Sequence, residues 1–138
     1  EQYALLRSDF DAHIDNAIDE VLRFTSTTTN FTRAATEDTE IGGYPVKKGD
    51  NIYLSYAAAN RDPSIFEDPH RFDITRPNAK RHLAFGVGPH VCIGARLAKM
   101  QLICPLQSGP KSMLFWTRKG MKNAIQKTHA GGDYRQAA

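Results

Sequence analysis

The sequence predicts an α+β protein that is mainly helical, and three observations predict it. Apolar residues recur at helical spacing over residues 14–24, residues 52–56 alternate apolar and polar side chains, and a second helical pattern begins near Cys92. A period of 3.6 residues is typical of an amphipathic helix, whereas alternation is typical of a half-buried strand. The 138 residues, of which 41% are hydrophobic and 24% charged, suffice for one small globular domain.

The first helical pattern carries a charged pair opposite its apolar stripe. The stripe consists of Ile14, Ala17, Ile18, Val21 and Leu22. Glu20 and Arg23 lie on the other side, one turn apart. An exposed pair at this spacing stabilises a helix by only roughly 0.2–0.5 kcal/mol. The pattern alone therefore favours a solvated ion pair.

Residues 31–56 predict a small antiparallel sheet. Gly42 and Gly43 supply the positive φ angles that a two-residue hairpin turn needs, and "NIYLSY" reads as a strand. "AAANRDP" predicts a short helical turn that stops before Pro63. From there to Pro77 we expect a surface meander. Four apolar side chains should pin it to the core: Ile65, Phe66, Phe72 and Ile74.

The last helical pattern places Ile93, Leu97 and Met100 on one stripe and breaks at Cys104-Pro105. Six basic residues stand against one acidic residue from Cys104 onward, whereas twelve stand against fourteen before it. We therefore predict a domain over 1–103 and a basic, divergent tail over 104–138 that is either poorly ordered or foreign to the family of that domain. A basic tail can attract nucleic acid, but a solvated chain end is the simpler interpretation.

Several function classes are disfavoured by composition. No apolar run is long enough to span a bilayer, no secretory leader is evident, and no nucleic-acid or membrane partner is expected. Two cysteines make no disulfide framework, which fits a cytoplasmic location. The chain begins with glutamate, so we expect it to be part of a longer protein.

The stretch "FGVGPHVCIG", residues 85–94, surrounds one thiol with glycines. Cys92 could be a small buried apolar residue, a zinc ligand or a nucleophile. Candidate companions for zinc are His90, Cys104, His82 and His70, but their spacing lacks paired motifs, and no papain-like context is present. Another interpretation follows from its place before a helix, where free N–H groups favour a thiolate.

The glycines of this stretch suit a flat partner. Gly86, Gly88 and Gly94 allow tight turns and close approach of the backbone, and Phe85 could cover one side of the sulfur. A shielded thiolate beside a flat apolar surface is what a haem iron with an axial thiolate requires.

The stretch resembles the haem-binding loop of the cytochrome P-450 family, Phe-Gly-x-Gly-x-(His/Arg)-x-Cys-x-Gly. All six fixed positions match, namely Phe85, Gly86, Gly88, His90, Cys92 and Gly94. "EVLR" resembles the family's Glu-x-x-Arg helix motif, and "FDITRPN" resembles the segment that adds an arginine, here Arg76, to that pair. "FTRAA" resembles the strand whose arginine, here Arg33, binds a haem propionate. "AAANRDP" and "HLAFG" look like soluble bacterial members, and the resemblance covers about residues 1–103.

The resemblance implies the proximal half of the family's fold and a set of roles. Cys92 would be the axial ligand of the iron of haem b (iron protoporphyrin IX), and His90 and Arg33 would bind its propionates. Glu20, Arg23 and Arg76 would form a buried structural triad in place of the solvated pair. Thr28 and Thr29 would border the substrate cavity.

The implied activity is that of a monooxygenase. It would hydroxylate a small organic substrate with dioxygen and electrons from a ferredoxin or flavodoxin-type partner. The family's long central helix, with its acid–alcohol pair, has no counterpart in this sequence. Three hypotheses therefore stay open: a piece of a monooxygenase, a haem-binding module without oxygenase activity, and a non-functional remnant.

Overall fold

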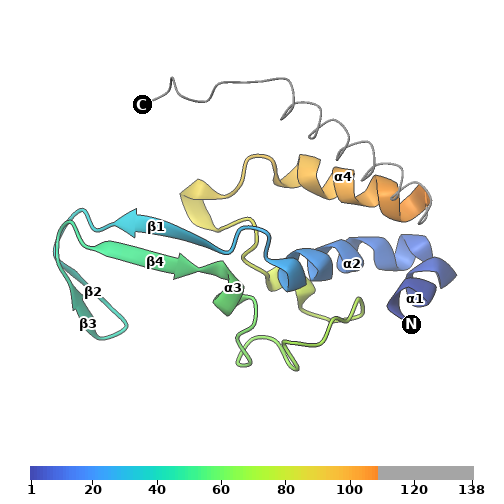
Figure 1. Ribbon diagram of the computed structural model, residues 1–138, viewed down its shortest axis with the longest axis horizontal. Coiled ribbons are helices and arrows are strands. Elements are labelled where there is room, and N and C mark those ends of the chain that lie inside the picture. The colour runs from blue at the N-terminus through green and yellow to red at the C-terminus, as the bar shows by residue number, and fades with distance from the viewer. Residues whose placement is uncertain (109–138) are drawn as a thin grey trace, which may run out of the picture. The chain divides into compact units, whose positions relative to one another are not determined.

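The computed structural model describes residues 1–108, which combine helices with antiparallel strands and confirm the predicted α+β class (Figure 1). The elements in chain order are α1 (Gln2–Ser8), α2 (Phe10–Thr25), β1 (Asn30–Ala34), β2 (Thr39–Ile41), β3 (Tyr44–Val46), β4 (Asn51–Ser55), α3 (Tyr56–Ala59), the 3₁₀ turns η1 (Ala79–Arg81) and η2 (Gly88–His90), and α4 (Ala95–Ser108). One compact unit spans Glu1–Arg96, and a second begins at Leu97.

Helix α2 is the predicted first helix, extended by four residues at its start. The Asp9 carboxylate accepts the N–H of Ala12 at 3.1 Å and so caps the first turn. The helix ends where Ser26 takes a left-handed φ of 42°. Four residues of the apolar stripe are buried and Val21 is half-buried, and the stripe forms the core together with residues of α1 and of later segments. The buried apolar side chains are Leu6, Ile14, Ala17, Ile18, Leu22, Ala35, Phe66, Ile74 and Ala79.

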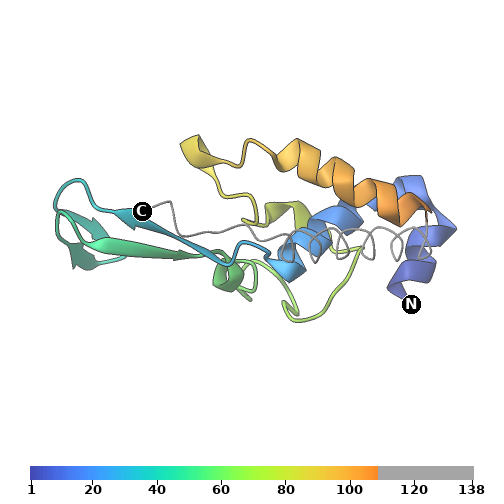
Figure 2. The same ribbon diagram turned by 45° about the horizontal axis from the view of Figure 1, so that its top comes forward.

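The strands form two antiparallel pairs. β1 pairs with β4, with Phe31 opposite Leu54 and Arg33 opposite Ile52. β2 and β3 form the predicted hairpin, in which Gly42 and Gly43 have φ angles of 58° and 85°. Figures 1 and 2 show this hairpin at the far end of the longer β1–β4 ribbon.

The expected single sheet is thus divided into two two-stranded sheets. The interruption has a local cause in the turn 47–50 and in Asp38. The N–H of Lys47 bonds to the Asp50 carboxylate at 2.8 Å, and the N–H of Lys48 bonds to the Asp38 carboxylate at 2.9 Å. These backbone donors are occupied by carboxylates and are not available to a continuous strand ladder.

The segment between α3 and η1 has no regular structure, as the meander prediction required. Phe66 and Ile74 are buried, whereas Ile65 and Phe72 are half-buried. The Phe72 ring packs edge-on against Phe24 of α2 with 5.5 Å between centroids. These contacts fix the meander against α2.

The predicted helix break at Cys104-Pro105 is wrong. Helix α4 continues to Ser108 with Pro105 inside it. Pro105 removes the N–H that would bond to the Gln101 carbonyl oxygen, and its ring crowds that oxygen, so it weakens this turn but does not end the helix. The helix therefore crosses the predicted boundary between 103 and 104, and the rest of the predicted tail lies outside the described residues. The stripe of Ile93, Leu97 and Met100 is exposed.

Candidate functional site

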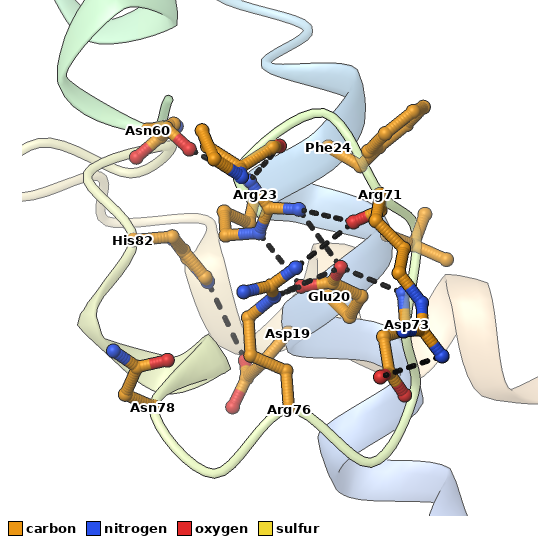
Figure 3. A network of polar contacts seen from close by, with 12 residues as sticks. Asp19, Glu20, Arg23, Phe24, Asn60, Arg71, Asp73, Arg76, Asn78 and His82 are labelled. Carbon is orange, nitrogen blue, oxygen red and sulfur yellow. Dashed lines mark hydrogen bonds and ion pairs between the residues drawn. The ribbon is translucent and has the colours of Figure 1, made fainter. Parts of the chain in front are cut away.

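The charged pair of α2 is the centre of a buried network (Figure 3). Glu20 and Arg23 are fully buried, and Arg76 is 6% exposed. Arg23 holds Glu20 through two parallel bonds, Nε to Oε2 at 2.7 Å and Nη2 to Oε1 at 2.8 Å. Arg76 Nε lies 3.2 Å from Glu20 Oε2. The solvated ion pair that the pattern alone favoured is therefore wrong, and the three side chains meet as the resemblance implies.

The two guanidinium groups also fasten the meander to α2. Arg23 Nη1 donates to the carbonyl oxygens of Asn60 and Pro69, at 2.8 and 2.9 Å. Arg76 Nη2 donates to those of Asp68 and Arg71, at 3.1 and 2.9 Å. Among residues 1–107, every buried side-chain nitrogen and oxygen has a hydrogen-bond partner. The network is fully satisfied, which is the condition under which buried charge is tolerated.

Two buried polar side chains, whose roles the sequence interpretation missed, bind the residues just before the cysteine loop. Asn60 is fully buried, and its Oδ1 accepts the N–H of Leu83 at 2.7 Å. His82 Nδ1 accepts the N–H of Ala84 at 3.1 Å, so Nε2 is the nitrogen that faces Asp19, at 3.4 Å (Figure 3). The only sequence signals were an asparagine at the end of a helical turn and a histidine just before the loop.

The cysteine loop folds back on its own first residue. The N–H of Cys92 donates to the carbonyl oxygen of Phe85 at 2.9 Å, and the N–H of Gly86 donates to that of Leu83, also at 2.9 Å. Between them lies the turn η2, and the N–H of Ala95 then bonds to the Cys92 carbonyl oxygen at 3.2 Å as α4 begins. Cys92 therefore stands at the entrance of a helix, as predicted.

Two of the three loop glycines occupy backbone conformations that require glycine. Gly86 and Gly88 have φ angles of 70° and 74°. A Cβ on Gly86 would also lie 3.1 Å from the Tyr56 hydroxyl, whereas Gly88 faces open space. At Gly94 a Cβ would lie 3.8 Å from Cys92 Sγ, an ordinary contact.

The Cys92 thiol is exposed, and the predicted shielding by Phe85 is not observed. The Phe85 ring is half-buried and packs edge-on against the ring of His82, with 5.8 Å between centroids. The thiol is therefore free to meet a ligand from outside this part of the chain, and it is not enclosed in a packed interior.

Arg33 and His90 line one cavity of about 280 Å³. The other lining residues are Leu54, Ser55, Tyr56, Ala59, Leu83 and Val87. Arg33 Nη1 donates to the Thr32 carbonyl oxygen at 3.0 Å, and its guanidinium lies 5.6 Å from the centre of the Phe31 ring. The cavity thus has largely apolar walls and two side chains, Arg33 and His90, whose nitrogens can donate hydrogen bonds to a carboxylate.

The zinc alternative finds no support in the described part of the chain. No group of three or more His, Cys, Asp or Glu side chains within residues 1–108 could hold a metal ion. His70, His82 and Cys104 do not join Cys92 in such a group. Within the same range, no helix is both long and apolar enough to cross a bilayer.

Comparisons with known proteins point to one family. Residues 13–107 match the family described as cytochrome P-450. The chain is 46% identical over 102 residues to linalool 8-monooxygenase of Pseudomonas putida, covering 74% of this chain and 25% of that protein. It is 45% identical over 101 residues to 6-deoxyerythronolide B hydroxylase of Saccharopolyspora erythraea, covering 73% of this chain and 24% of that protein.

Solved structures agree with the sequence matches. A cytochrome P-450 from Novosphingobium aromaticivorans superimposes with a TM-score of 0.74 at 44% identity, covering 78% of this chain and 27% of that structure. The chain spans about a quarter of the length of the relatives it matches. The family match covers well over half of this chain, and the buried triad and the cysteine loop lie within it. On these grounds the chain belongs to the cytochrome P-450 family.

Proposed function

We propose that this chain supplies the thiolate ligand and the proximal wall of a haem b site in a monooxygenase that hydroxylates a small organic substrate. The observation that carries the proposal is the cysteine loop, in which an exposed Cys92 stands at the entrance of α4, two residues after His90, and His90 lines a cavity together with Arg33. When bound, haem iron with an axial thiolate supplies dioxygen activation.

The described residues fit such a group in charge and polarity. The cavity walls are largely apolar, which suits a flat macrocycle, and Arg33 with His90 suits its two carboxylates. Cys92 holds the sulfur that would bind the iron. Phe85, Gly86, Gly88 and Gly94 would shape the backbone around that sulfur.

The remaining parts of the proposal concern the complete protein. Electrons would come from a ferredoxin or flavodoxin-type donor, and the protein would act in the cytoplasm. Thr28 and Thr29 would border the substrate, and both are exposed in the segment between α2 and β1. The relatives named as monooxygenase and hydroxylase support this reaction class.

Haem titration of the full chain tests the ligand assignment. We expect the ferrous carbonyl complex to show the absorption typical of thiolate ligation, and Cys92→Ser to abolish it. Cys104→Ser is the matched control, since this second exposed cysteine lies outside the loop. Retention of the thiolate spectrum in Cys92→Ser would refute the assignment.

The two residues at the cavity are tested separately. Replacing Arg33 or His90 by Ala should weaken haem binding without changing the ligand type, because each removes a partner of a carboxylate and leaves the sulfur. Equal haem affinity in both variants and in the wild type would contradict their role. Substrate turnover with a surrogate redox partner, in a protein that contains this segment, tests the oxygenase activity.

A further inference from the structure

Asn60 connects the buried triad to the cysteine loop. Its backbone carbonyl oxygen accepts Arg23 Nη1 at 2.8 Å, and its side-chain Oδ1 accepts the N–H of Leu83 at 2.7 Å. Its Nδ2 donates to the Ser26 hydroxyl at 3.0 Å. The residue is fully buried, so none of these groups can exchange its partner for water without local opening.

The contact to Leu83 is the first in a short series of backbone bonds. The Leu83 carbonyl oxygen accepts the N–H of Gly86, and the Phe85 carbonyl oxygen accepts the N–H of Cys92, both at 2.9 Å. Holding the Leu83 N–H therefore restrains the backbone whose next carbonyl oxygen binds the turn on which the Cys92 backbone closes.

We propose that Asn60 is a positioning residue that holds the cysteine loop in register with the triad. This inference rests on the proposed role of Cys92 as the haem ligand. Its effect is to place the Cys92 sulfur relative to α2. None of the three charged triad side chains contacts the loop directly, so Asn60 supplies the connection.

The choice of an amide at this position follows from its two neighbours. The Ser26 hydroxyl donates its own hydrogen to the Arg23 carbonyl oxygen at 2.9 Å, so toward Asn60 it can only accept. The Leu83 N–H can only donate. A short side chain that offers one donor and one acceptor satisfies both, and asparagine has this property.

The experiment measures amide hydrogen exchange in the full chain by NMR. Gly86 and Cys92 report on the loop, and amides of α2 report on the rest of the unit. Asn60→Ala removes the acceptor, and Asn60→Asp keeps an acceptor for Leu83 but loses the donor to Ser26. The matched control is Asn16→Ala, whose amide donates to the Ile74 and Arg76 carbonyl oxygens at 2.6 and 3.0 Å, away from the loop.

We expect Asn60→Ala to raise the exchange rates of the two loop amides about tenfold relative to those of α2, as loss of one buried hydrogen bond predicts. Asn60→Asp should keep that ratio near the wild-type value even where global stability falls, and Asn16→Ala should leave it unchanged. An unchanged ratio in Asn60→Ala, or the same change in Asn16→Ala, would overturn the inference. If the Asn60→Ala variant does not fold cooperatively, Asn60→Ser is used in its place. The serine side chain is too short to accept the Leu83 N–H, so this variant also removes the acceptor.

A spectroscopic measurement separates this inference from the proposed function. With iron protoporphyrin IX added, Asn60→Ala should give a smaller share of the thiolate-type ferrous carbonyl spectrum than Asn16→Ala does. Equal shares in the two variants would count against positioning of the sulfur. A wild-type chain that binds no haem would refute the proposed function, and the exchange ratio would still decide whether Asn60 holds the loop.

Discussion

Replacement of Arg23 by alanine tests the buried network most directly. The change removes both bonds to the Glu20 carboxylate and the donors to the carbonyl oxygens of Asn60 and Pro69. Arg76 remains 3.2 Å from Glu20, so the carboxylate keeps one cation. Removing one partner of a buried ion pair costs about 3–5 kcal/mol, and the remaining cation places the expected loss near the lower end of that range.

The assay is urea unfolding of the full chain followed by far-ultraviolet circular dichroism. Lys47→Ala is the matched control, because it removes the same charge from an ion pair with Asp38 whose side chains are 73% and 63% exposed. Exposed pairs contribute little, so we expect this midpoint to stay near that of the wild type. If Arg23→Ala and Lys47→Ala unfold at the same urea concentration, the buried network does not stabilise the fold and the reasoning is wrong.

A lysine at position 23 separates charge from geometry. Lysine keeps the positive charge but cannot reproduce the paired bonds to Glu20 together with a bond to the Asn60 carbonyl oxygen. We therefore expect Arg23→Lys to recover little of the stability lost in Arg23→Ala. Full recovery would show that charge alone is sufficient.

Two further predictions concern the loop and the meander. Gly86→Ala should lower the free energy of unfolding more than Gly88→Ala does. Both positions have positive φ, which costs about 1–3 kcal/mol for other residues, but only a Cβ at position 86 would also lie 3.1 Å from the Tyr56 hydroxyl. Equal losses in urea unfolding would contradict this. The Thr75 hydroxyl, and then the Thr75 backbone N–H, hold the pKa of Asp73 below its ordinary value of 3.8. A lowered folded pKa contributes stability above the unfolded pKa that is lost as pH falls through the folded pKa. The stability advantage of the wild type over Asp73→Asn should therefore shrink below pH 3.8, and an advantage independent of pH in acid titrations would show that the carboxylate does not act through its charge.

The elements that local pattern determines were predictable from the sequence. The α2 stripe, the Gly42-Gly43 hairpin and the meander fixed by Phe66 and Ile74 are each determined by spacing or by turn chemistry within a few residues. The continuation of α4 past Cys104 was not, because a proline inside a helix weakens it without always ending it, and the sequence alone does not tell which outcome holds.

Pattern also failed where contacts join distant parts of the chain. Glu20 and Arg23 have the spacing of an exposed pair, and their burial depends on Arg76 and on carbonyl oxygens of the meander more than thirty residues away. Asn60 has the same character, since its partners Ser26 and Leu83 lie 34 and 23 residues from it. No local window contains these partners, so periodicity could not reveal the roles of these residues. The resemblance supplied the triad but not Asn60.

Around the triad and the cysteine loop, burial departs from the usual pattern, and this departure bears on where a ligand would bind. Charged side chains of the triad are buried, whereas Val87, Val91 and Ile93 of the cysteine loop are 71%, 55% and 104% exposed. Exposed apolar side chains grouped beside an exposed thiol are costly in water unless something covers them. Asn60 and His82 hold the residues just before the loop by polar contacts, to the N–H of Leu83 and to Asp19 respectively. The exposure of these apolar side chains supports the proposal that haem binds on this side of the loop.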